Sequence, residues 1–159
     1  MDNAIAKKSL RLFSYGLYIA TTADKDGNRG SMLVNWVGQV SFEPRMLSLS
    51  VENTAHFLDV IRDSGVFAIN VIDSEQREIA GHFGKSTAKL GDKLIGYEWT
   101  PGSTGSPLLA EALASVECRV TSEQPAGDHV LFIGEVVDAH YNRDGDALTM
   151  KEAGFKYSG

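Results

Sequence analysis

The sequence predicts a mainly β protein whose antiparallel sheet closes into a barrel. Seven short segments rich in β-branched and aromatic residues alternate with turn signals along the 159 residues, and only a few stretches have helical periodicity. This pattern is typical of small barrels, in which closure removes the exposed sheet edges. We expect one domain over residues 1–159, long enough to bury about two thirds of its unfolded surface.

The first elements are expected to be a short helix and a hairpin. Residues 4–13 mix apolar side chains with lysines, which suits a short amphipathic helix. Residues 17–22 are rich in β-formers, and the DKDGN turn at 24–28 leads into a strand that starts at Gly30.

From Gly30 the chain is expected to form two long strands joined by a turn at 42–45, where Pro44 presets the backbone angle. Apolar residues alternate with polar ones along the first strand, as in a half-buried strand, at Val34, Trp36, Val40 and Phe42. A helix follows, and Asn53 or Thr54 is expected to cap it. A helix N-terminus at the mouth of a sheet favours anion binding.

The second half of the chain returns to sheet after a long loop. The expected elements are, in order, a buried strand from Gly65, a helix near 74–82, a long functional loop over 81–105 with a short helix or strand inside it, a strand over 113–121, a tight turn at Gly127-Asp128, and a strand over 129–141 broken by Gly134.

Composition excludes several classes of protein. A net charge of −6 without a basic cluster argues against nucleic-acid binding. No apolar run approaches the roughly 20 residues of a membrane span, so membrane insertion is not expected, and the N-terminus lacks a cleavage site, which predicts a mature cytoplasmic chain. The single cysteine, Cys118, excludes an internal disulfide and is expected to be a buried structural thiol.

Absent motifs exclude two further classes. No G-x-S-x-G elbow occurs, so nothing indicates hydrolase chemistry. No G-x-G-x-x-G occurs either, so nucleotide redox chemistry would need an architecture other than the Rossmann fold.

The loop over residues 81–94, GHFGKSTAKLGDKL, combines glycines, hydroxyls and lysines as phosphate sites do. Ser86 or Thr87 would donate hydrogen bonds, and Lys85 and Lys93 would supply charge. The spacing of its glycines excludes a Walker A loop. A solvated loop is the alternative, and the sequence leaves both open.

The histidines at 56, 82, 129 and 140 lack metalloprotease spacing, and the acidic turns at 24–27 and 142–146 lack calcium-ligand spacing, so no metal site is expected. His129 begins a strand, where it is either presented at a barrel mouth or simply satisfied locally. His56 either faces solvent or contacts phosphate. Trp36 and Met32 either pack in the core or face a flat apolar ligand.

Five motifs together resemble one known family. They are GSMLVNWVGQVSFEPRMLSLSVEN, SGVFAINVI, HFGKS with Asp92-Lys93, GSPL leading into ALASVECRV, and GDHVLFIGEVVDA. In this order, over about residues 8–157, they resemble the flavin reductase-like, FMN-binding split-barrel family. That family includes the flavin reductase components of two-component monooxygenases, flavoredoxin and archaeal ferric reductase.

The resemblance implies a six-stranded antiparallel Greek-key split barrel with peripheral α-helices, assembled as a homodimer with one flavin per subunit. It implies that the flavin rings and ribityl chain are bordered by Gly30, Ser31, Met32, Asn35, Trp36 and Val37, with backbone contacts from Ser50, Val51 and Glu52. It implies a phosphate site between Asn53-Thr54 and the loop of Phe83, Gly84, Lys85 and Ser86, with Lys93 nearby, and the possible phosphate contact of His56 would belong to the same site.

The resemblance also implies an activity, namely an NAD(P)H-dependent flavin reductase that uses FMN, with FAD as an alternative, and serves free flavin, a redox partner protein or a monooxygenase. His129 would position the nicotinamide, because hydride transfer is the cofactor's own chemistry. An electron carrier with tightly bound FMN is the second hypothesis, and a flavin- or heme-binding module without turnover is the third. Ala55 and Phe57 stand where relatives commonly carry a serine and a threonine, so the expected phosphate site lacks those hydroxyls. Asn35 and Trp36 stand where the flavin reductase partners of monooxygenases usually have smaller residues, and these larger side chains favour a tightly held flavin.

Overall fold

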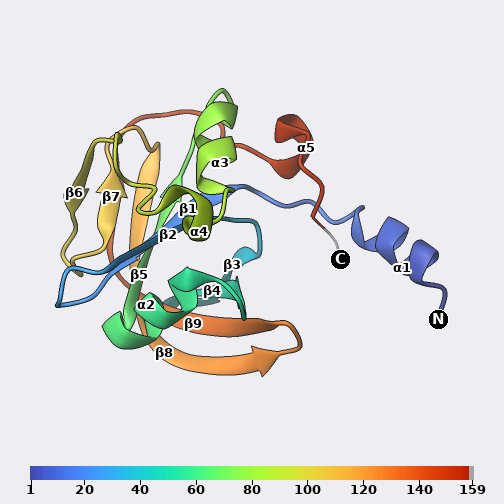
Figure 1. The fold of residues 1–159 in the computed structure, drawn as a ribbon, viewed down its shortest axis with the longest axis horizontal. Helices are drawn as coiled ribbons and strands as arrows, with labels where there is room; N and C mark the ends of the chain where they lie inside the picture. The colour runs from blue at the N-terminus through green and yellow to red at the C-terminus, as the bar shows by residue number, and fades with distance from the viewer. Residues whose placement is uncertain (158–159) are drawn as a thin grey trace.

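The computed structural model describes residues 1–157 and confirms a mainly β architecture with a few peripheral helices (Figure 1). The strands are β1 Tyr18–Ala23, β2 Arg29–Val34, β3 Val37–Phe42, β4 Arg45–Glu52, β5 Val66–Val71, β6 Trp99–Pro101, β7 Pro107–Leu109, β8 Ala114–Ala126 and β9 His129–Tyr141. The helices are α1 Asn3–Leu10, α2 His56–Ser64, α3 Arg77–Phe83, α4 Thr87–Leu90 and α5 Met150–Ala153.

Seven strands form one antiparallel sheet in the order β2-β1-β5-β8-β9-β4-β3, and β6 pairs with β7 separately. The two edge strands, β2 and β3, are joined directly by Asn35 and Trp36. Because two residues cannot span a flat seven-stranded sheet, the sheet must curl until its edges meet at that link. The barrel is therefore split between β2 and β3, and the expectation of a fully closed barrel was wrong, while the split-barrel class is confirmed with seven strands instead of six.

The expected single strand from Gly30 to Phe42 is two strands at opposite edges of the sheet. Trp36 leaves the β2 ladder, and its carbonyl oxygen accepts a hydrogen bond from the Ser50 amide. Beyond the break, on the edge strand β3, Val40 and Phe42 are 53% and 84% exposed. Alternation along a sequence reveals a strand's two faces but not whether either face is covered.

Strand β9 continues through Gly134, so the expected break does not end the strand, but the β8–β9 ladder has a register shift there: Val120 pairs with Gly134 and Ser122 with Ile133. A Cβ atom at Gly134 would lie 2.6 Å from the Phe67 ring and 2.9 Å from Cβ of Cys118. Glycine is needed here for close packing across the barrel interior.

Two hydrophobic clusters stabilise the fold. The first fills the barrel beneath α2 and includes Phe67, Phe132 and Cys118. Cys118 is a buried free thiol, as predicted, and its burial raises its pKa to about 12. The second lies under α3 and includes Phe83 and Leu148. Residues from both clusters, among them Phe57 of the first and Phe83 of the second, line one cavity, which is described below.

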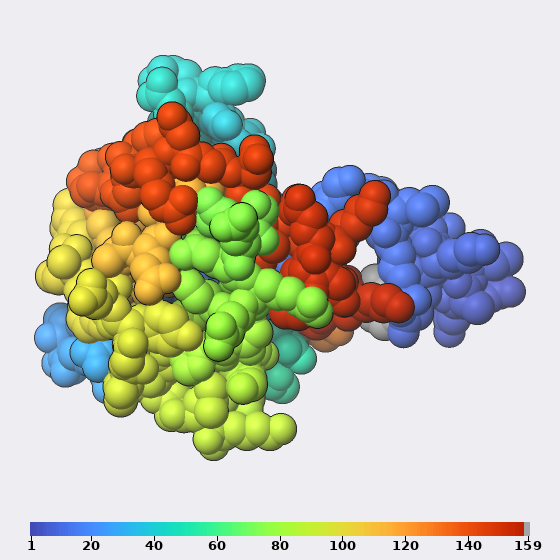
Figure 2. All heavy atoms as spheres, turned by 90° about the horizontal axis from the view of Figure 1, so that it is seen from above, coloured from blue at the N-terminus to red at the C-terminus, as the bar shows by residue number. Residues whose placement is uncertain are grey.

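The terminal segments lie on one side of the barrel (Figure 1). Helix α1 buries none of its side chains and projects from the body. Helix α5 lies beside α3, and residues of the two segments meet on the face shown in Figure 2. Within residues 1–157, no helix has the length and apolar character required to cross a membrane.

Candidate functional site

A cavity of about 690 Å³ opens at the split in the barrel. Its walls come from β2, the Asn35-Trp36 link, the ends of β4 and β9, the start of α2, the α3–α4 loop and the segment after α5. Elements from five separate parts of the chain thus meet around one hollow, which is large enough for a cofactor-sized ligand.

Most of the residues that the sequence analysis assigned to a ligand line this cavity. They are Ser31, Met32, Asn35, Trp36, Ser50, Glu52, Thr54, His56, Phe83, Gly84, Lys85, Ser86, Lys93 and His129. The structure places Gly30, Val37, Val51 and Asn53 outside the lining. Val51 is fully buried in the barrel core, and the Phe57 ring covers Gly30, so neither residue faces the cavity.

The sequence analysis missed the contribution of the C-terminal segment. Met150, Phe155, Lys156 and Tyr157 all line the cavity, as does Ala88. No spacing or motif marks these residues, because only the packing of α5 against the barrel brings them to the cavity.

Lys93 organises the loop that borders one end of the cavity. Its side chain is buried, and Nζ donates hydrogen bonds of 2.9 Å to the carbonyl oxygens of Phe83 and Lys85. Burial lowers the pKa of Lys93 to about 8, because the charged ammonium loses its hydration. The ammonium therefore draws the loop's carbonyl groups inward.

The same loop turns unpaired amides toward the cavity. In the described part of the chain, the backbone N–H groups of Ser86, Thr87 and Ala88 have no protein acceptor. All three residues line the cavity, beside the exposed side chain of Lys85. Backbone donors next to a lysine have the chemistry of an anion-binding surface, which is what the sequence leads us to expect of this loop.

The start of α2 lies across the cavity from this loop, but its expected side-chain cap is absent. Ala55 is the N-cap residue and makes no side-chain hydrogen bond. The Asn53 side chain instead donates to the carbonyl oxygen of Gly127, and the Asn53 backbone N–H donates to the carbonyl oxygen of Asp128. Asn53 therefore ties the β8–β9 turn to β4, a tertiary contact that outcompetes local capping.

The other end of the cavity has an aromatic surface around His129, which is 8% exposed. The Trp36 ring lies 4.8 Å from the His129 ring. Nδ1 of His129 lies 2.7 Å from a carboxylate oxygen of Asp128, and this hydrogen bond lowers the Asp128 pKa. Because an ionised carboxylate only accepts, Nδ1 carries the hydrogen, and Nε2 lies 3.3 Å from the hydroxyl of Tyr157, another residue of the cavity lining.

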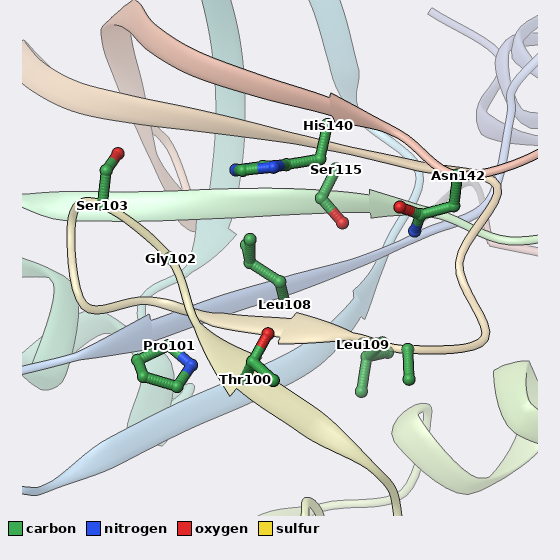
Figure 3. A pocket seen from close by; sticks show the side chains of 10 residues that line it. Thr100, Pro101, Gly102, Ser103, Leu108, Leu109, Ser115, His140 and Asn142 are labelled. Carbon is green, nitrogen blue, oxygen red and sulfur yellow. The ribbon is translucent and has the colours of Figure 1, made fainter.

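A second cavity of about 280 Å³ lies between the β6–β7 hairpin and the ends of β8 and β9 (Figure 3). None of the described residues lines both cavities. Beside the second cavity, Glu117, Asp138 and His140 each have an atom that could bind a metal ion, and these atoms lie within 4.8 Å of one another. The fully buried Glu117 carboxylate accepts hydrogen bonds from Ser103, Thr104 and His140. Burial alone would raise the Glu117 pKa, but these bonds outweigh it and lower the pKa. The cluster is thus accounted for as an anchor of the 102–106 loop.

The fold and the first cavity together define a class of protein, namely a split barrel whose cavity joins a loop with free amides to an aromatic surface. The chain belongs to the flavin reductase like domain family, whose model matches residues 10–159.

Named relatives agree with this family. The chain is 36% identical over 140 residues to a ferric-chelate reductase (NAD(P)H) from Archaeoglobus fulgidus, covering 86% of this chain and 81% of that protein. It is 32% identical over 153 residues to an NADH-dependent flavin reductase from a Rhodococcus species, covering 94% and 83%. The solved structure of flavin reductase PheA2 matches with a TM-score of 0.80 and 29% identity, covering 94% and 93%.

Proposed function

We propose that this protein is an NAD(P)H-dependent flavin reductase that binds FMN and passes electrons from nicotinamide through the flavin to free flavin or another acceptor. The observation that supports this proposal most directly is that one cavity has loop amides without a protein acceptor at one end and an aromatic surface at the other. FMN has the matching chemistry, a phosphate at one end and a planar ring system at the other. The family membership and the named activities of the relatives support the same conclusion.

The phosphate end of the site would be formed by the α3–α4 loop and the start of α2. The amides of Ser86, Thr87 and Ala88 would donate to phosphate oxygens, and Lys85 would supply charge. Lys93 would act indirectly, by holding the loop carbonyls away from the anion. Ala55 and Phe57 offer no hydroxyl, so the opposite wall would depend on Thr54 and backbone amides.

The ring end of the site would be formed by Met32, Asn35 and Trp36. The Asn35 amide is held 3.0 Å from the sulfur of Met150, which fixes this wall against α5. When bound, the flavin supplies the hydride-accepting chemistry. The protein's part is to exclude water and to orient the two ring systems.

His129 would position the nicotinamide. Asp128 holds its Nδ1 hydrogen, so that Nε2 is directed into the cavity as an acceptor. His129→Ala should retain FMN but slow the reduction of the flavin by nicotinamide by roughly tenfold or more, because a mispositioned donor rarely reaches the attack geometry. Stopped-flow measurement of flavin bleaching tests this, and an unaltered rate removes His129 from the mechanism.

The activity itself is tested by mixing the purified protein with NADH or NADPH and following nicotinamide oxidation with added FMN. Oxidation that depends on both protein and flavin is expected. If neither nucleotide is oxidised, the reductase assignment is wrong.

A second candidate is an electron carrier with tightly bound FMN that reacts poorly with nicotinamide. The observation that favours it is the bulky Trp36 and the Tyr157 ring, 5.4 Å apart, at the mouth of the cavity. FMN that survives extensive dialysis, together with no nicotinamide oxidation, would favour this candidate over the reductase.

We also infer that the chain acts as one flavin reductase-like domain and assembles as a homodimer. The edge strand β3 exposes Val40 and Phe42, an apolar surface that a second copy would cover. A cytoplasmic location fits a chain whose one cysteine is a free, buried thiol. Light scattering of wild type and Phe42→Ser tests the assembly, with a shift toward monomer expected in the variant.

A further inference from the structure

The segment after α5 lies over the ring end of the cavity, and its path is fixed by the protein itself. Helix α5 ends at Gly154, whose left-handed backbone turns the chain. The Phe155 amide then donates to the carbonyl oxygen of Met150, and its ring lies 5.9 Å from the guanidinium of Arg77. Tyr157 is thereby delivered to the cavity lining.

Tyr157 engages both features of the ring end. Its hydroxyl lies 3.3 Å from Nε2 of His129, the nitrogen left free by Asp128. Its ring lies 5.4 Å from that of Trp36 and 6.4 Å from that of His129. The cavity-facing nitrogen and the aromatic surface are therefore both in contact with this one side chain.

A phenol and a nicotinamide offer these neighbours similar chemistry. Each is a flat six-membered ring with a polar substituent that can donate a hydrogen bond, the hydroxyl in one and the carboxamide in the other. Tyr157 is also 45% exposed, and its hydrogen bond to His129 is long, so it is held loosely enough to be displaced.

We propose that Tyr157 occupies the nicotinamide position in the ligand-free protein and must be displaced for the dinucleotide to bind. This inference rests on the proposed reductase function. The C-terminal segment thereby acts as an internal competitor, and its docked population sets the apparent affinity for nicotinamide.

The test compares Tyr157→Ala and Tyr157→Phe with wild type. Tyr157→Ala should lower the KM for NADH or NADPH by about fivefold, because the competitor is removed from a site it fills most of the time. Tyr157→Phe keeps the ring but loses the hydrogen bond, so its KM should fall by a smaller factor. Nitrogen NMR of His129 gives a readout independent of activity, since the Nε2 resonance of the ligand-free protein should shift in both variants.

Tyr141→Phe is the matched control, because Tyr141 donates its hydroxyl to Asp144 and lines neither cavity. It should leave the KM and the Nε2 resonance unchanged. An unchanged or higher KM in Tyr157→Ala, with normal nicotinamide oxidation by wild type, would overturn the inference while the reductase function stands. Absence of nicotinamide oxidation by the unmodified protein would overturn both.

Discussion

Two loops of this protein are each held by a buried charge, and they end with opposite capacities for a ligand. In the α3–α4 loop the Lys93 ammonium binds the carbonyl oxygens of Phe83 and Lys85. In the 102–106 loop the Glu117 carboxylate binds the amides of Ser103 and Thr104. The two arrangements are electrostatic opposites on one barrel.

The difference lies in which backbone groups remain free. A buried cation takes up carbonyls, so the amides of the α3–α4 loop stay available to an anion. A buried anion takes up amides, so the 102–106 loop keeps few donors for a ligand. The sign of the buried charge thus separates a loop whose amides remain free from a loop whose amides are already hydrogen-bonded.

The largest expected effect is on the structural loop. Glu117→Gln should lower the free energy of unfolding by about 4 kcal/mol, because loss of the charge leaves buried donors poorly paired. FMN affinity should be unchanged, since Glu117 does not line the larger cavity, where we propose that FMN binds. Urea denaturation and flavin titration measure the two quantities.

Glu123→Gln is the control for this change, because Glu123 forms an exposed ion pair with Arg62. Its effect on stability should stay below about 1 kcal/mol. Equal losses in the two variants would show that the Glu117 anchor contributes little.

A somewhat smaller effect is expected on the binding loop. Lys85→Ala combined with Ser86→Ala should weaken FMN binding by about 3 kcal/mol, as loss of charged hydrogen bonds does, with little change in stability. Fluorescence titration with FMN measures the affinity. Lys89→Ala, on α4 but outside the cavity lining, should bind FMN normally. An unchanged affinity in the double variant would contradict the phosphate assignment.

The smallest expected effect concerns the pH dependence of Lys93. Its pKa is lowered to about 8 in the folded protein, so between there and its ordinary value the unfolded chain binds more protons. Stability should therefore rise with pH across this window, by about 2 to 3 kcal/mol at most. Lys93→Met should remove this rise, as measured by unfolding at about pH 7 and about pH 10.

Lys89→Met is the matched control for the pH series, because Lys89 is exposed on the same loop. It should keep the wild-type pH dependence. A rise of the same size in Lys93→Met would mean that another group is responsible.

Most of the residues that the sequence assigned to a ligand line one cavity, because the side chains that suggest ligand chemistry are close together in the sequence. The loop over residues 81–94 has its donors and charges within a few residues, so composition alone indicated an anion site. The β8–β9 turn at Gly127-Asp128, which presents His129, was likewise marked by its residues.

Local pattern failed where distant elements compete for the same groups. Asn53 was expected to cap α2, but its side chain bonds across the barrel to Gly127. Lys93 lines the cavity as expected, but its ammonium donates to the carbonyl oxygens of Phe83 and Lys85, two partners that the sequence did not indicate. Neither outcome follows from neighbouring residues, because both partners are set by packing.

By itself, the sequence determined the β class, the hairpin order and the family, since alternation, turn residues and motif order are properties of contiguous segments. Only the tertiary structure decided that the barrel splits at Asn35-Trp36 and that Tyr157 lies against Trp36 and His129. Both depend on how far the sheet curls and on where α5 packs. Those are sums of many weak long-range contacts that no short stretch of residues encodes.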